Sequence, residues 1–277
     1  MPADQASSRW KQFWDRGGWW KALIAAAVYY GLYQLASLGL IPIVRPLLGS
    51  STSVASILLA VALPIAIGCV ILVLFVASVG WLRELFARQP IRGGKWMWIA
   101  VGVVLLFNIL RFAATDYGKA GFGFVAAWLF AALFIGFAEE VLTRGIVVNL
   151  MRRAGHPEIA VGLVSAAIFA GLHAGNLLTG QALFPTLVQL VYTFCFGICM
   201  YLSLRITGNL LWPILLHAST DPSIFIMTTY PSASPIAGLA GLGNIVVIAF
   251  GLIAIIFIRG RVGRPAYDPP LRGASLA

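Results

Sequence analysis

Uninterrupted apolar runs dominate this chain of 277 residues, and their length constrains its fold more than any other feature. An α-helix needs about 20 apolar residues to cross the hydrocarbon core of a bilayer. Charged residues make up only 10% of the chain, whereas soluble proteins carry about a quarter. The runs therefore predict an all-α, polytopic membrane protein, and they exclude a soluble enzyme or a disordered chain.

The runs predict about eight transmembrane helices in a single membrane domain over residues 22–258, with its catalytic part at 122–227. Cytoplasmic tails at 1–21 and 259–277 flank this domain. The third and seventh spans have the weakest signal, and Pro213 and Pro222 should bend or break the seventh. The predicted spans are residues 22–44, 54–79, 96–114, 122–151, 159–178, 183–204, 210–227 and 236–258.

The basic residues predict the orientation of these spans. Of 19 Lys and Arg residues, only Arg45, Arg111 and Lys119 fall on the side opposite the N-terminus. Because cytoplasmic loops are rich in Lys and Arg, both termini should be cytoplasmic. The basic residues form no patch with interleaved aromatic residues, so we expect no nucleic-acid partner. The Arg- and Trp-rich chain with short loops favours a bacterial inner membrane.

Two further segments have a structural interpretation. Residues 81–89 form either an amphipathic helix on the cytoplasmic interface or an ordinary connecting loop. Cys195 and Cys199 lie one helical turn apart in an apolar run. This spacing gives no disulfide framework and indicates core packing.

Ionisable residues interrupt three of the spans at middle depth: Glu139, Glu140, His173, His217 and Asp221. Such residues are costly in a bilayer, so they nearly always face protein or a water-filled cavity. They predict one intramembrane site that activates water, although separate polar contacts between helices would also explain them. The other six acidic residues fall in predicted tails or loops: Asp4, Asp15, Glu84, Asp116, Glu158 and Asp268.

Local spacing divides these residues into groups. Glu140 and Arg144 have the i, i+4 order of a helical ion pair, and Glu139 points about 100° away from Glu140. His217 and Asp221 are also at i, i+4, a spacing that can fix an imidazole tautomer or bind a metal.

A third group lies on the fifth span. Phe169, His173 and Asn176 share one face of the predicted helix. They would place an aromatic ring, an imidazole and an amide on one wall of the site.

Together these motifs resemble the CPBP family of intramembrane proteases, which contains the CAAX prenyl endopeptidases and the bacteriocin-processing and self-immunity proteins. The resemblance covers about residues 122–221, and the run GNLLWPILLHASTD is similar to the third motif of the family. It rests on three motifs in order, Glu139-Glu140-x-x-x-Arg144, Phe169-x-x-x-His173 and His217-x-x-x-Asp221.

The resemblance implies hydrolysis of a peptide bond inside an eight-helix bundle. It implies that Glu139 and His173 activate a water molecule and that Glu140 pairs with Arg144. It also implies that His217, together with the residue at 221, stabilises the oxyanion. The substrate would be a peptide or a membrane protein, but nothing in the sequence specifies which, nor the oligomeric state.

The residue at position 221 departs from the family, which often has Asn there. An ionised Asp cannot donate a hydrogen bond to an oxyanion. Asp221 would therefore orient His217, stay protonated or ligate a metal, and Asn176 is the nearest amide that could donate instead.

No cofactor is expected, although Glu139, His173, His217 and Asp221 could together bind one zinc ion. The motifs HExxH, GxSG and GxGD of other intramembrane proteases are absent from the sequence. A proton-coupled transporter, or a scaffold with structural polar contacts, is the alternative interpretation.

Overall fold

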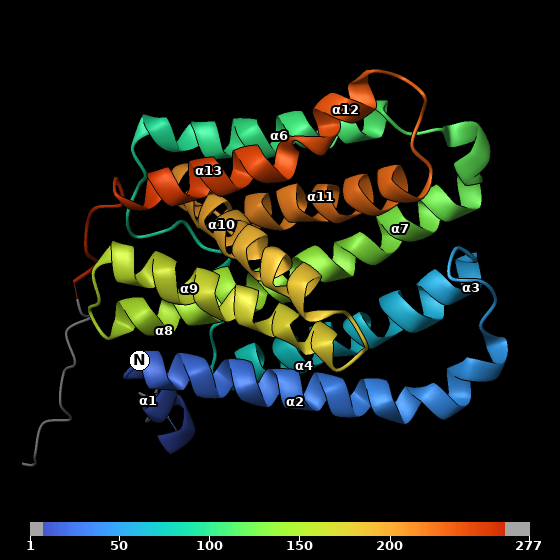
Figure 1. Cartoon of the computed structure of the whole chain (residues 1–277). Coiled ribbons are helices and arrows are strands. Elements are labelled where there is room, and N and C mark those ends of the chain that lie inside the picture. The colour runs from blue at the N-terminus through green and yellow to red at the C-terminus, as the bar shows by residue number, and fades with distance from the viewer. Residues whose placement is uncertain (1–7, 264–277) are drawn as a thin grey trace, which may run out of the picture.

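The computed structural model describes residues 8–263, and within this range the chain folds into one bundle of α-helices without a β-strand (Figure 1). Short 3-10 segments cover Arg45–Leu47 (η1), Lys95–Met97 (η3) and Ala174–Leu177 (η5), and π-helical segments cover Ile57–Ala62 (η2) and Val141–Val147 (η4). The helices are Arg9–Asp15 (α1), Trp19–Val44 (α2), Val54–Ser56 (α3), Leu63–Ser78 (α4), Leu82–Leu85 (α5), Trp98–Ala113 (α6), Tyr117–Glu140 (α7), Val148–Arg153 (α8), Glu158–His173 (α9), Leu183–Thr207 (α10), Leu211–Thr229 (α11), Ile236–Gly241 (α12) and Gly243–Ile255 (α13).

Seven helical segments of the described chain are long and apolar enough to cross a membrane. They correspond to seven of the eight predicted spans, so the prediction of a polytopic all-α protein is confirmed. Their outward faces carry large exposed apolar side chains, among them Leu35, Leu74 and Ile253. In a soluble protein such surfaces would be unfavourable, whereas in a multi-pass membrane protein they face lipid.

The remaining predicted span, 210–227, forms α11 but does not have the hydropathy of a lipid-facing span. One face of α11 packs against α6, α7 and α10 (Figure 1), while apolar side chains on its other face, such as Trp212, stay exposed. Its polar side chains His217, Thr220 and Ser223 are buried against these neighbours. Protein contacts rather than lipid therefore accommodate its polarity.

The seventh span is not broken at either of its prolines. Pro213 lies in the first turn of α11, where a missing N–H costs little, and the helix continues through Pro222.

Both ends of the described chain lie at the same end of the bundle. The backbone N–H of Gly18 donates to the carbonyl of Leu150, and the N–H of Glu158 donates to the carbonyl of Gly260. An even number of membrane crossings gives this arrangement when α11 is counted as a crossing. The basic residues within 8–263 that the sequence assigns to one side gather at this end, which we call the basic end.

Glu158, expected in a loop, is instead the buried first residue of α9. Its carboxylate accepts hydrogen bonds from Arg152 at 2.7 and 2.8 Å, from Arg205 at 3.0 Å and from the Tyr201 hydroxyl at 2.5 Å. Arg205 also donates to the backbone carbonyl of Arg92. This cluster ties the helix ends to the loops, so Arg152 and Arg205 serve packing as well as topology.

The structure also tests the predictions for residues 81–89 and for the two neighbouring cysteines. Of residues 81–89, only Leu82–Leu85 is helical, a single turn with Leu85 buried, so the segment is mostly a connecting loop. Cys195 and Cys199 are buried free thiols, which confirms that they pack in the core.

α7 and α11 approach closely at Gly136. A Cβ atom at this position would lie 2.7 Å from the carbonyl oxygen of Ile214 and 2.9 Å from the backbone nitrogen of Ala218. Glu139 and Glu140 follow within about one turn, so this contact brings them to the level of His217. The missing side chain at Gly136 is thus a condition for assembling the polar residues.

We expect Gly136→Ala to push α7 and α11 apart and to lower the stability of the folded protein by about 1–3 kcal/mol, the usual cost of overpacking. Thermal melting of the purified protein measures this loss. Gly102→Ala on α6 is the matched control, because a Cβ there meets no atom within 4 Å. Equal melting temperatures for the two variants would contradict the importance of this contact.

Candidate active site

A π-helical segment begins directly after the two adjacent glutamates of α7. The segment Val141–Val147 follows Glu140 and contains Arg144. π-Helical turns inside α-helices are rare and occur often at functional sites, because they change the direction in which side chains point. The side chain of Glu139 is 22% exposed and lines a cavity, whereas that of Glu140 is fully buried.

Glu140 connects α7 to α11 through a buried network. Its Oε1 accepts hydrogen bonds from Arg144 Nη1 at 3.1 Å and from His217 Nδ1 at 2.8 Å. Arg144 Nη2 donates to the carbonyl oxygen of Gly197 on α10 at 2.7 Å. The i, i+4 ion pair indicated by the sequence is therefore present, and the same carboxylate also orients the His217 ring.

The other ring nitrogen of His217 faces the two remaining carboxylates. Its Nε2 lies 3.6 Å from Glu139 Oε2 and 3.8 Å from Asp221 Oδ2. These separations are longer than hydrogen bonds. Nε2 thus lies beside two carboxylates that themselves line a cavity.

Two phenylalanines surround the imidazoles. The Arg144 guanidinium lies over the Phe169 ring at 4.7 Å, and this ring makes edge contacts with His173 at 4.9 Å and with His217 at 5.6 Å between ring centroids. Phe196 of α10 packs on His217 at 5.0 Å. Sequence reasoning missed Phe196, since one phenylalanine in an apolar span carries no distinguishing signal.

His173 is the last residue of α9, and its ring is oriented by its own helix. Nδ1 lies 2.9 Å from the carbonyl oxygen of Phe169. Because a carbonyl can only accept, Nδ1 carries a proton, and in the neutral ring Nε2 has the free lone pair. An imidazole in this state can accept a hydrogen bond from water or bind a metal.

Glu139, His173, Asn176 and Asp221 line a common cavity with a volume of about 750 Å³. The structure thus brings together residues from α7, α9, η5 and α11, as the sequence predicts for a single site. Asn176 follows the end of α9, and its amide nitrogen donates to Gln189 on α10 at 2.9 Å. Gln189 also lines this cavity, and the sequence analysis did not single it out.

A smaller chamber of about 210 Å³ shares Glu139, His173 and Asn176 with this cavity. It adds tyrosines from α2, among them Tyr29, whose buried hydroxyl has no hydrogen-bond partner among the described residues. A chamber of this size, lined by several polar groups, has room for ordered water. Nothing in the sequence pattern marked Tyr29, which occurs in an ordinary apolar span.

The donor set for a metal is a separate question. Within residues 8–263, no group of three or more His, Cys, Asp and Glu side chains is arranged to hold a metal ion, and this includes Glu139, His173, His217 and Asp221. The shortest separations within this set of four are those from His217 Nε2 to Glu139 at 3.6 Å and to Asp221 at 3.8 Å.

Residues 121–222 match the family model described as type II CAAX prenyl endopeptidase, Rce1-like. The comparisons with curated proteins and with solved structures found no match. The matched segment begins in α7 and ends in α11, and it contains all three motifs on which the sequence resemblance rests. Over this segment, the chain is similar to the CAAX-protease-like membrane proteins of the CPBP family.

Proposed function

We propose that the protein is an intramembrane endopeptidase that hydrolyses a peptide bond with a water molecule activated by Glu139 and His173. One observation carries the proposal: Glu139 and His173, from two helices, line one cavity inside the bundle, and Nε2 of the buried His217, from a third helix, lies 3.6 Å from Glu139. The similarity of residues 121–222 to the family model supports a CAAX-protease type of peptidase.

In the proposed reaction, water is held between the Glu139 carboxylate and Nε2 of His173. Glu139 takes a proton as the water oxygen bonds to the carbonyl carbon of the substrate. The C–N bond then breaks, and the proton passes to the leaving amine. The orphaned Tyr29 hydroxyl in the shared chamber supplies a further contact for ordered water.

His217 would stabilise the oxyanion through Nε2. Donation from both nitrogens requires an imidazolium, and the carboxylates of Glu140, Glu139 and Asp221 supply the opposite charge around the ring. Asp221 then acts as a positioning and charge-balancing residue, and it need not donate a hydrogen bond itself.

The test is cleavage by purified protein in detergent, with two fluorogenic CAAX-type peptides that differ only in a prenyl group. We expect cleavage without any ion gradient, because hydrolysis needs none, and no change when a chelator is added. Loss of activity with chelator and recovery with zinc would replace the glutamate mechanism by a metal mechanism. Gradient-dependent flux in vesicles without cleavage would instead identify a transporter.

We also propose that the basic end of the bundle faces the cytoplasm of a bacterial cell. The expected result is that alkaline phosphatase fused after Ala277 is inactive, because the enzyme needs the periplasm to fold. Fusion after Thr52, in the loop at the opposite end, should be active. The reverse pattern would overturn the orientation.

A further inference from the structure

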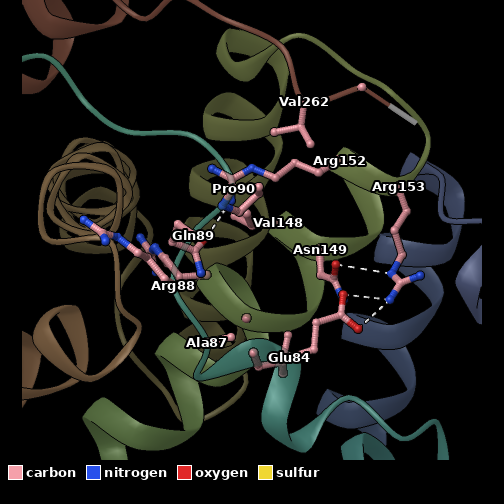
Figure 2. A pocket seen from close by; sticks show the side chains of 14 residues that line it. Glu84, Ala87, Arg88, Gln89, Pro90, Val148, Asn149, Arg152, Arg153 and Val262 are labelled. Atoms are coloured by element: carbon pink, nitrogen blue, oxygen red, sulfur yellow. Dashed lines mark hydrogen bonds and ion pairs between the residues drawn. The ribbon is translucent and has the colours of Figure 1, made fainter. Parts of the chain in front are cut away.

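A second cavity, of about 450 Å³, opens at the basic end of the bundle (Figure 2). It lies between the loop after α5 and the segment from η4 to α8, with Arg88 and Gln89 on one wall and Asn149 and Arg153 on the other. None of its lining residues lines either chamber of the catalytic cavity. Its size is that of a small-molecule site.

Two buried N–H groups of this cavity have no acceptor among the described residues, namely Arg144 Nε and Asn149 Nδ2. Arg144 is only 1% exposed. The Asn149 amide is oriented by Arg153, whose Nε donates to its Oδ1 at 3.3 Å, so the unpaired atom is the amide nitrogen. A buried donor without a partner costs about 1–3 kcal/mol. Two of them in one cavity therefore indicate a bound acceptor.

The charges of the lining specify the acceptor further. Four arginines, Arg88, Arg144, Arg152 and Arg153, and one acid, Glu84, line the cavity. Three of the arginines already pair with acids: Arg144 with Glu140, Arg152 with Glu158, and Arg153 with Glu84 and Asp15. Glu84 is neutralised by Arg153, which donates to both of its carboxylate oxygens at 2.6 and 2.7 Å. Arg88 is exposed and makes no hydrogen bond or ion pair with a described residue. The unpaired charge at the cavity is therefore the positive charge of Arg88, and together with the two unpaired N–H donors it suits an anion with several oxygen acceptors.

We propose that this cavity binds a phosphate group, supplied by an anionic lipid headgroup or by a soluble phosphate compound. Arginine suits phosphate because its planar N–H groups match the oxygens. The site is at the level where lipid phosphates meet the basic end of a membrane protein. Arg144, one of the lining residues, pairs with Glu140, which in turn accepts a hydrogen bond from His217, so the cavity adjoins the network that orients His217. This proposal does not depend on peptidase activity.

Binding is tested on the purified full-length chain by thermal melting at constant ionic strength. One arm titrates inorganic phosphate against chloride, and the other compares vesicles of phosphatidylcholine alone with vesicles that also contain phosphatidylglycerol. We expect a saturable rise in melting temperature in at least one arm. A rise with phosphate identifies a soluble ligand, and a rise with phosphatidylglycerol alone identifies a lipid.

The informative variant is Asn149→Asp, which keeps an acceptor for Arg153 but replaces the unpaired donor with a negative oxygen. It should weaken binding at least about tenfold. Arg83→Gln, on α5 next to the lining residue Glu84 but not itself lining the cavity, should bind like wild type. If Asn149→Asp does not fold, Arg88→Gln, at an exposed position, should show the weakening.

Two results would overturn the proposal. One is the absence of a saturable shift in both arms. The other is a shift that the cavity variants and Arg83→Gln share equally with wild type, since that shift would come from general surface charge.

Discussion

Glu139→Gln should fold normally and cleave at least about 10²-fold more slowly than wild type, because an amide cannot remove a proton from water at neutral pH. The substitution preserves the shape of the side chain at the cavity wall, where Glu139 is partly exposed and lies 3.6 Å from Nε2 of His217. The measurement is kcat with a cleaved peptide, alongside thermal melting. Full activity in this variant would refute the proposed mechanism.

Combining Glu139→Gln with His173→Ala should cost little more than either change alone, because residues that hold one water act as a unit. Multiplied losses in the double variant would show that the two residues act on separate steps. The control is Gly102→Ala on α6, where an added Cβ meets no atom within 4 Å.

Glu140→Gln should lower the free energy of unfolding by about 3–5 kcal/mol, because it leaves the buried Arg144 guanidinium without its counter-charge. Both side chains of this pair are 0% exposed. The folded fraction should also lose activity, since Glu140 orients the His217 ring. The amount of folded protein in membranes and its melting temperature measure the effect.

Glu84→Gln is the matched comparison for this change. Glu84 pairs with Arg153 at 2.6 Å, but its side chain is 45% exposed. A solvent-exposed ion pair contributes only about 0–1 kcal/mol, so this variant should remain stable. A Glu140→Gln protein with wild-type abundance and melting temperature but no activity would contradict the structural role and make Glu140 itself catalytic.

The sequence determined the features of this protein that depend on neighbours along the chain. Apolar runs form helices because, inside a bilayer, backbone N–H and C=O groups have no hydrogen-bond partners except one another. The ends of most spans fall close to their predicted positions. The spacing of Glu140 and Arg144 also indicated their ion pair, because residues four apart lie on the same face of a helix. The polar residues of the site stood out because acids and imidazoles are costly in apolar spans.

Only the tertiary structure decided which of these groups meet. His217 reaches Glu140 across 77 residues of sequence, and Glu158 gathers Arg152 and Arg205 into a buried cluster. α11 could carry polar residues because one of its faces packs inside the bundle, a position that hydropathy does not encode. The unpaired Arg144 and Asn149 nitrogens likewise became visible only once packing had assigned partners to the groups around them. Such contacts depend on how helices approach in three dimensions, and small details such as the absent side chain at Gly136 control that approach.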